Sequence, residues 1–76
     1  SYFSIPEENI SLLQILNQLP EFYRILLTKK YIQGYKQKEI ASELKLPIGT
    51  VGGNIQSGIK LVKAIILKEG LTKSDF

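Results

Sequence analysis

Cysteine and histidine are both absent from the 76-residue chain. Their absence excludes a disulfide scaffold, a zinc-binding module and any acid–base or nucleophilic chemistry that depends on histidine. The sequence also has no apolar run near the ~20 residues that span a membrane, and it has no signal-peptide pattern. We therefore expect no metal or other cofactor and no membrane partner.

The rest of the composition describes one small, slightly basic globular domain. Ten Lys and Arg residues against seven Asp and Glu residues give a net charge of +3. This charge leans towards a polyanionic partner, although an ordinary surface has a similar balance. A hydrophobic content of 43% favours a folded domain over a disordered tail. Because the chain begins with Ser1 and not with Met, we expect a C-terminal piece of a longer protein.

Proline, glycine and apolar spacing together predict four helices, and hence an all-α domain without wing strands. Pro6, followed by two acidic residues, suits the start of a first helix, and Pro20 suits the start of a second. Gly34 suits the residue just after a helix, and Gly70 should end the last one. The expected helices cover residues 6–18, 20–33, 37–44 and about 50–68, with a leader at 1–5 and a tail at 71–76.

The first expected helix carries more apolar residues than one face of such a small bundle needs. They are Ile10, Leu12, Leu13, Ile15 and Leu16. Either the whole stripe belongs to the core, or part of it docks another protein. The second expected helix has a further apolar face, which consists of Phe22, Ile25, Leu26, Tyr31 and Ile32.

Residues 37–56 have the pattern of two short helices joined by a sharp turn. Helical spacing relates Ile40, Ala41 and Leu44, and residues 45–49 then interrupt it with a proline and a glycine. The small Ala41 would let a second helix cross closely over the first. This is the arrangement of the helix-turn-helix, whose second helix can enter the major groove of DNA. An ordinary corner between two helices has the same spacing, so spacing alone leaves both interpretations open.

Four short sequence elements occur in a fixed order along most of the chain. They are Leu16-Asn-Gln-Leu19-Pro20 with Arg24, Tyr31-Ile-Gln-Gly34, Glu39-Ile40-Ala41 and Pro47-Ile-Gly49-Thr50-Val51. In this order and spacing they resemble region 4 of bacterial sigma factors, most closely the extracytoplasmic-function and related alternative sigma factors. Helix-turn-helix regulators of the LuxR type share the Glu-Ile-Ala and Thr-Val elements but usually lack the Leu-Pro, which favours the sigma-factor interpretation.

The resemblance implies a four-helix domain with two kinds of partner. In that family the last helix binds the −35 element of double-stranded promoter DNA, and an apolar surface of the earlier helices docks on the β flap of core RNA polymerase. Anti-sigma factors often cover the same surfaces. The resemblance thus implies a DNA-binding transcription-initiation module, not an enzyme, that works in the bacterial cytoplasm at the nucleoid.

The candidate DNA-binding residues fall into three groups. Lys36, Gln37 and Lys38, at a helix N-terminus, would position phosphates, unless they form only a solvated turn. Gly49 and Thr50 would set the start of the last helix against the DNA backbone. The residues expected to face the groove are Gly52, Gly53, Asn54, Gln56 and Ser57.

Glycine makes this recognition helix depart from the family pattern. Where related sigma factors commonly read Lys-Ser-Arg-Leu-x-Arg-Ala, this chain reads Gly52-Gly53-Asn54-Ile55-Gln56-Ser57-Gly58. Base reading needs side-chain donors and acceptors, which here only Asn54, Gln56 and Ser57 supply. Either the glycines let the backbone approach DNA closely, with specificity taken from DNA shape, or the domain binds DNA poorly and acts mainly through a protein partner.

Two other classes of function stand beside promoter binding. A sigma-like protein-interaction or regulatory module with a degenerate helix-turn-helix would use the apolar faces without reading DNA, and salt-dependent DNA binding would count against it. An enzyme is disfavoured because the seven carboxylates are spread along the expected helices. The stretch Val51-Gly52-Gly53-Asn54 also lacks the spacing and the lysine of a phosphate-binding loop.

Overall fold

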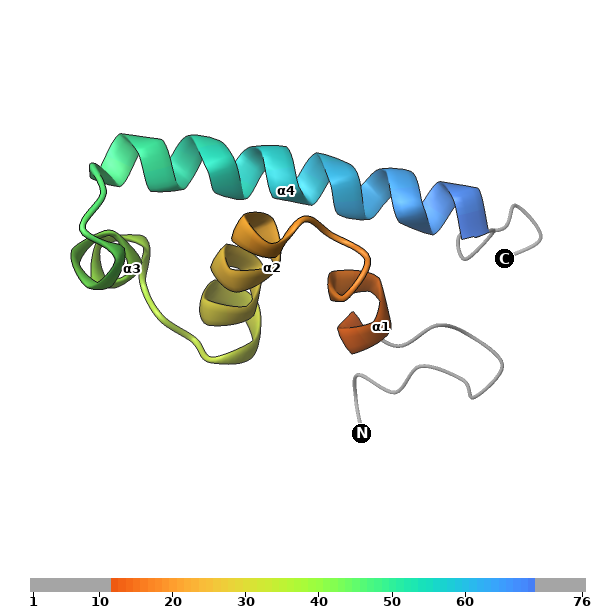
Figure 1. Ribbon diagram of the computed structural model, residues 1–76, viewed down its shortest axis with the longest axis horizontal. Helices are drawn as coiled ribbons and strands as arrows, with labels where there is room; N and C mark the ends of the chain where they lie inside the picture. The colour runs from red at the N-terminus through yellow and green to blue at the C-terminus, as the bar shows by residue number, and fades with distance from the viewer. Residues whose placement is uncertain (1–11, 70–76) are drawn as a thin grey trace.

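The computed structural model describes residues 12–69 of the chain. Its elements in chain order are α1 (Leu12–Leu16), α2 (Glu21–Leu27), the π-helical segment η1 (Thr28–Ile32), α3 (Gln37–Leu44) and α4 (Ile48–Glu69). α4 is the longest helix, and α1, α2 and α3 all lie along one side of it (Figure 1). No strand occurs within residues 12–69, so the all-α prediction is confirmed. The expected leader, the start of the first helix, Gly70 and the tail lie outside the described residues.

The core forms where α1, α2 and α3 pack against α4. Its largest fully buried side chains are Leu26, Ile40 and Val51, one each from α2, α3 and α4. The other members of the buried cluster are Leu16, Leu19, Leu27, Ala41 and Ile55. Each fully buried aliphatic side chain stabilises the fold by about 1.5–3 kcal/mol, so the three central residues fix α2 and α3 against α4.

α1 buries only part of the apolar stripe that the sequence assigns to the first helix. Ile15 and Leu16 are buried, Leu12 packs partly against the core, and Leu13 is 59% exposed. A helix of five residues makes little more than one turn and so presents only one face to its neighbours. The interpretation of the whole stripe as core is therefore wrong at Leu13, and Ile10 lies outside the described residues.

The second expected helix is α-helical only as far as Leu27, because the chain then widens into η1. The N–H of Gln33 donates to the carbonyl oxygen of Thr28 at 2.9 Å, which is the five-residue spacing of a π-helix. Gly34 follows with a φ of 79°, the left-handed conformation that favours glycine. The prediction of Gly34 as the residue that follows the helix is confirmed, and the last turn before it is π-helical.

The apolar face expected on the second helix is only partly buried. Leu26 is fully buried, but Phe22, Tyr31 and Ile32 are exposed. A π-helix holds more residues per turn than an α-helix, so Tyr31 and Ile32 no longer follow the face that Leu26 presents to α4. Phe22 lies in the first turn of α2 and packs near the ring of Tyr23, with the ring centroids 6.1 Å apart. The predicted apolar face therefore contributes Leu26 to the core and leaves Phe22, Tyr31 and Ile32 on the surface.

α3 ends in a left-handed turn that directs the chain back towards α4. Lys45 has a φ of 58° and is the one residue other than glycine with a positive φ in the described part of the chain. The N–H of Leu46 donates to the carbonyl oxygen of Ala41 at 3.0 Å, which satisfies a carbonyl at the end of α3. The interruption that the sequence predicts after Leu44 is thus a helix-ending motif.

α4 begins at Ile48, two residues before the predicted start. The carbonyl oxygen of Pro47 accepts the N–H groups of Thr50 at 3.0 Å and Val51 at 3.1 Å. Proline has no N–H to leave unpaired at a helix start, so it is well suited to this position. Gly49 is consequently helical, and its expected place in the turn is wrong.

Candidate nucleic-acid interface

α3 and α4 form a helix-turn-helix. α3 lies beneath the first turns of α4 and is seen nearly end-on in Figure 1, so the two helices cross steeply. Ala41 is only 6% exposed and belongs to the same buried cluster as Ile40, Val51 and Ile55. Its side chain is a single methyl group, which lets α4 approach α3 closely. The prediction of a close crossing at Ala41 is confirmed.

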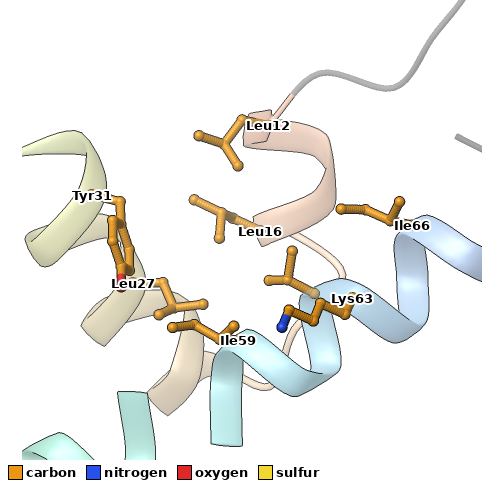
Figure 2. Close-up of a pocket in the computed structure, with 8 residues that line it drawn as sticks. Leu12, Leu16, Leu27, Tyr31, Ile59, Lys63 and Ile66 are labelled. Atoms are coloured by element: carbon orange, nitrogen blue, oxygen red, sulfur yellow. The ribbon is translucent and has the colours of Figure 1, made fainter. Parts of the chain in front are cut away.

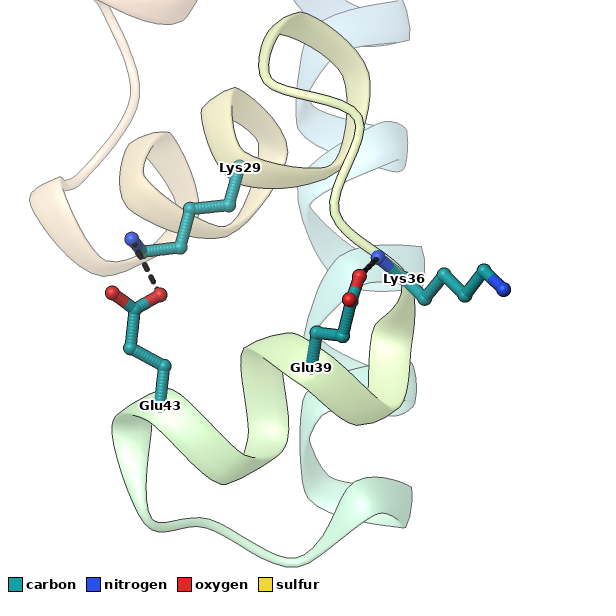
Figure 3. A network of polar contacts seen from close by, with 4 residues as sticks. All are labelled: Lys29, Lys36, Glu39 and Glu43. Carbon is teal, nitrogen blue, oxygen red and sulfur yellow. Dashed lines mark hydrogen bonds and ion pairs between the residues drawn. The ribbon is translucent and has the colours of Figure 1, made fainter.

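The N-terminus of α3 presents two exposed lysines. Lys36 is the N-cap residue, and its backbone N–H donates to Oε1 of Glu39 at 2.7 Å. The side chain of Lys36 extends away from Glu39 (Figure 3), and Lys38 is also exposed. A lysine side chain has no acceptor, so it cannot cap the N–H groups of the first turn. Those N–H groups and the two ammonium groups suit a phosphate, while the carboxylate of Glu39 opposes one.

Gln37 has a partner within the protein. Its Nε2 donates to the carbonyl oxygen of Ile48 at 3.0 Å and so joins the first residue of α3 to the first residue of α4. The side chain is half-buried, unlike those of Lys36 and Lys38. A contact between Gln37 and a phosphate stays a prediction, and the structure adds a role in joining the two helices.

The face of α4 opposite the core carries a continuous exposed stripe. Its members recur every three or four residues and therefore share one side of the helix. They are Gly49, Gly53, Gln56, Ser57 and Lys60, all exposed, with the exposed Thr50 beside them. Neither glycine has any atom within 4 Å of the position that a Cβ would occupy. We call Gly49, Gly53, Gln56, Ser57 and Lys60 the α4 stripe.

Two of the predicted groove residues lie at the margin of this stripe. Asn54 is half-buried, and its Nδ2 donates to the carbonyl oxygen of Thr50 at 2.8 Å, one turn earlier in the same helix. Gly52 is half-buried beneath the amide of Gln37. The structure therefore brings Gly53, Gln56 and Ser57 together on the open face and places Asn54 and Gly52 towards its edges.

Lys60 is a member of the stripe that is missing from the sequence-based set of DNA-binding residues. It follows Gln56 by four residues and Gly53 by seven, so helical periodicity would have included it. Its ammonium group extends the stripe one turn beyond Ser57. A cation at this position can contact the phosphate backbone on the flank of a groove.

Gly58 differs from the glycines of the stripe because it faces the core. A Cβ there would lie 3.2 Å from Cδ1 and 3.3 Å from Cγ of Leu27, and 3.5 Å from Cβ of Tyr23. The absence of a side chain thus lets α2 and α4 pack closely. Gly58 therefore belongs to the buried face of α4.

An ion pair ties α3 to the segment before it. Nζ of Lys29 lies 2.9 Å from Oε1 of Glu43 (Figure 3), and the same ammonium is 5.3 Å from the ring centroid of Tyr35. The Lys29 side chain is 19% exposed and the Glu43 side chain 48%, so the pair is shielded from solvent only on the lysine side. It joins α3 to η1.

A second surface feature is an apolar groove between α1, the end of α2 with η1, and the middle of α4 (Figure 2). Its volume is about 490 Å³. The residues that line it are Leu12, Leu16, Leu27, Tyr31, Ile59, Val62, Lys63 and Ile66. We call it the α1–α4 groove. It lies apart from the α4 stripe, since Ile59 and Val62 belong to the inner side of α4.

Two further features, a metal-ligand cluster and a membrane-spanning helix, are absent from the described residues. Within residues 12–69 no group of three or more His, Cys, Asp or Glu side chains could hold a metal ion. No helix in this range is long and apolar enough to cross a membrane.

The structure thus places the chain among small all-helical domains with a helix-turn-helix, in which the second helix of the motif carries an exposed polar stripe. The family model described as Sigma-70, region 4 matches residues 9–62, which is more than half of the chain. The chain belongs to the sigma-70 region 4 family. This is a family of DNA-binding sigma-factor domains that act with RNA polymerase in transcription initiation. No curated protein and no solved structure matches the chain significantly.

Proposed function

We propose that this domain recognises the −35 element of a promoter as part of RNA polymerase holoenzyme. The observation that carries the proposal is the α4 stripe, which faces away from the core beside the N-terminus of α3. In a helix-turn-helix this side of the second helix enters the major groove. Gln56 and Ser57 supply the donors and acceptors that can read base edges. Lys36, Lys38 and Lys60 supply the charges that contact phosphates.

The two open glycines determine how α4 would lie in the groove. Gly49 and Gly53 leave the backbone of the stripe bare over its first two turns. The helix can therefore approach the DNA more closely there than a helix with long side chains. With only two side chains placed to read bases, direct readout is limited, and part of the specificity comes from the shape of the groove.

The salt dependence of binding follows from the number of phosphate contacts. We take the ammonium groups of Lys36, Lys38 and Lys60 to neutralise one phosphate each. The logarithm of the association constant then falls with the logarithm of the salt concentration at a slope of about −2.7. The affinity therefore drops about 40-fold between about 50 and 200 mM salt. A single module with so few contacts binds weakly by itself. Holoenzyme strengthens it because a second attachment to polymerase raises the effective concentration of the domain at the promoter.

The test compares binding to −35-type and scrambled duplexes over a salt series, by fluorescence anisotropy. The informative variant is Gln56→Ala combined with Ser57→Ala, which removes the two base-reading side chains. The matched control is Gln33→Ala combined with Ser42→Ala, which removes the same residue types at exposed positions outside the stripe. We expect the Gln56→Ala, Ser57→Ala variant to lose the promoter preference and the control variant to keep it. Equal binding of the wild-type chain to both duplexes, also with core polymerase present, would refute it.

The α1–α4 groove supports a second part of the function, which is docking on the β flap of core polymerase. The groove is apolar except for Lys63. It therefore suits a partner segment that inserts apolar side chains, as an amphipathic helix does, and an acidic residue opposite Lys63 would complement its charge. An anti-sigma factor that covers the groove would compete with polymerase for the same apolar surface.

Two tyrosines of the same segment provide the test of docking. Tyr31 lines the groove and Tyr35 does not, although both are exposed and each has a lysine ammonium within 6 Å of its ring centroid. Tyr31→Asp should weaken binding to a purified β-flap fragment, and Tyr35→Asp should leave it unchanged. An equal effect of the two substitutions would contradict docking in the groove.

A protein-interaction module without DNA reading is the second candidate function. It is favoured by Gln37 and Asn54, whose amide groups already have partners inside the protein. In that case the wild-type chain would bind polymerase through the groove and would show no salt-dependent preference for any duplex. The two experiments above separate this candidate from promoter recognition.

A further inference from the structure

The start of α3 and the start of α4 are joined by a side chain that reaches across the helix-turn-helix. Gln37 is the first residue of α3, and its Nε2 donates to the carbonyl oxygen of Ile48, the first residue of α4, at 3.0 Å. The two residues are 11 positions apart in the sequence. The bond therefore fixes the relative position of the two helix N-termini, and these are the ends that face DNA in the proposed function.

Gly52 provides the space that this contact needs. A Cβ on Gly52 would lie 2.5 Å from Nε2, 3.2 Å from Cδ and 3.4 Å from Oε1 of Gln37. The whole amide group thus lies against the bare backbone of Gly52. At Gly49 and Gly53 a Cβ would meet no atom within 4 Å. Of the three glycines in the first two turns of α4, only Gly52 has its missing side chain replaced by a neighbouring group.

We propose that Gln37 and Gly52 form a positioning pair, which sets the first turn of α4 against α3 and thereby places the α4 stripe relative to Lys36 and Lys38. The consequence for DNA rests on the proposed function. DNA presents phosphates and base edges at fixed separations, so the offset between the lysines and the stripe determines whether both can be engaged together. On this account Gly52 does not itself read DNA.

The substitution Gly52→Ala has two opposing effects on stability: it breaks the hydrogen bond of Gln37, and it raises the helix propensity of residue 52. The amide is the end of a flexible side chain, so the new methyl group would displace it and break the bond to Ile48. The methyl group also raises helix propensity, which increases the folding equilibrium constant about fivefold. Loss of one neutral hydrogen bond disfavours folding by about the same factor. Gly52→Ala should therefore change stability little, whereas in a Gln37→Ala background the same substitution should stabilise the fold about fivefold.

The test is a double-mutant cycle in the 76-residue chain with Gln37→Ala, Gly52→Ala and the combined variant, each verified as folded by circular dichroism. Urea unfolding gives the stability of each. NMR of the Gln37 side-chain amide reports directly on its bond to Ile48. Gly53→Ala is the matched control for folding and NMR, because it adds the same methyl group at the next residue into open space. Anisotropy gives the preference for −35-type over scrambled duplex.

Three results are expected. The Gln37 amide resonance moves to the position of a free amide in Gly52→Ala and stays in place in Gly53→Ala. The two substitutions are non-additive in stability by about fivefold. Gln37→Ala and Gly52→Ala each lose about fivefold in promoter preference, the effect of about one mismatched base pair, and the combined variant loses no more than either. The preference for promoter duplex over scrambled duplex would stay unchanged if the pair only stabilised the fold.

Additive effects on stability, or an unchanged Gln37 resonance in Gly52→Ala, would refute the proposal that Gln37 and Gly52 act as a pair. Full promoter preference in Gln37→Ala would overturn its role in placing the stripe. A wild-type chain that prefers no duplex would be a failure of the proposed function, visible without any variant. The resonance and the stability cycle would still decide in that case whether the pair positions α4.

Discussion

Gly58→Ala gives the sharpest test of the packing between α2 and α4. In an exposed helix interior, replacing glycine with alanine stabilises by about 1 kcal/mol. At Gly58 the new Cβ would lie 3.2 Å and 3.3 Å from two carbon atoms of Leu27, inside the ~3.5–4.0 Å of optimal carbon contact. Leu27 is only 2% exposed, so it has little room to move. Overpacking of this kind costs about 1–3 kcal/mol, and the net expectation is a destabilisation of about 1 kcal/mol.

Gly53→Ala is the matched comparison, because the same methyl group there meets open space. It should stabilise by about 1 kcal/mol, which raises the melting temperature by about 4–8 °C in a domain of this size. The two variants should thus differ by about 2 kcal/mol in the free energy of unfolding, measured by urea titration followed by circular dichroism. Equal stabilisation by both substitutions would refute the close packing of α2 on α4.

Three further predictions concern the core, a turn and the charges. Ile40→Ala removes a fully buried side chain beneath α4 and should destabilise by about 2–5 kcal/mol, seen as a loss of helical signal at moderate temperature; an unchanged unfolding curve would contradict its central place. Gly34→Ala forces a Cβ into the left-handed conformation and should cost about 1 kcal/mol in urea unfolding, and an unchanged stability would contradict the need for glycine at this turn. Lys36→Ala and Lys38→Ala should each reduce the salt slope of DNA binding by about 1 without changing sequence preference, whereas Lys68→Ala should not affect it.

The helix-turn-helix was largely predictable from local sequence signals. Ala41 marked the close crossing because it is the small residue in an apolar pattern whose other members, Ile40 and Leu44, are large. Gly34 and Pro47 marked the ends of elements because the conformational freedom of glycine and the fixed φ of proline both act locally. The family elements are built from these same residues, which explains why the fold class and the family could both be identified.

The remaining features depend on contacts between residues that are far apart in the sequence. The hydrogen bond from Gln37 to Ile48, over the backbone of Gly52, has no local signal, so the sequence could not distinguish Gly52 from the open Gly53. The π-helical segment after Leu27 likewise has no signal in the apolar spacing, so helical spacing alone placed Tyr31 on the same face as the buried Leu26. Lys60 is a different case, since its periodicity with the stripe was readable.

The most direct test of the central claim is an NMR titration of the isotope-labelled chain with a −35-type duplex, in which each backbone amide reports its own environment. The account predicts that the largest shifts occur at Gly53, Gln56 and Ser57 on the α4 stripe, and that amides lining the α1–α4 groove, such as those of Tyr31 and Val62, hardly move. Shifts concentrated in the groove, or none on the stripe when the duplex is in excess, would contradict it.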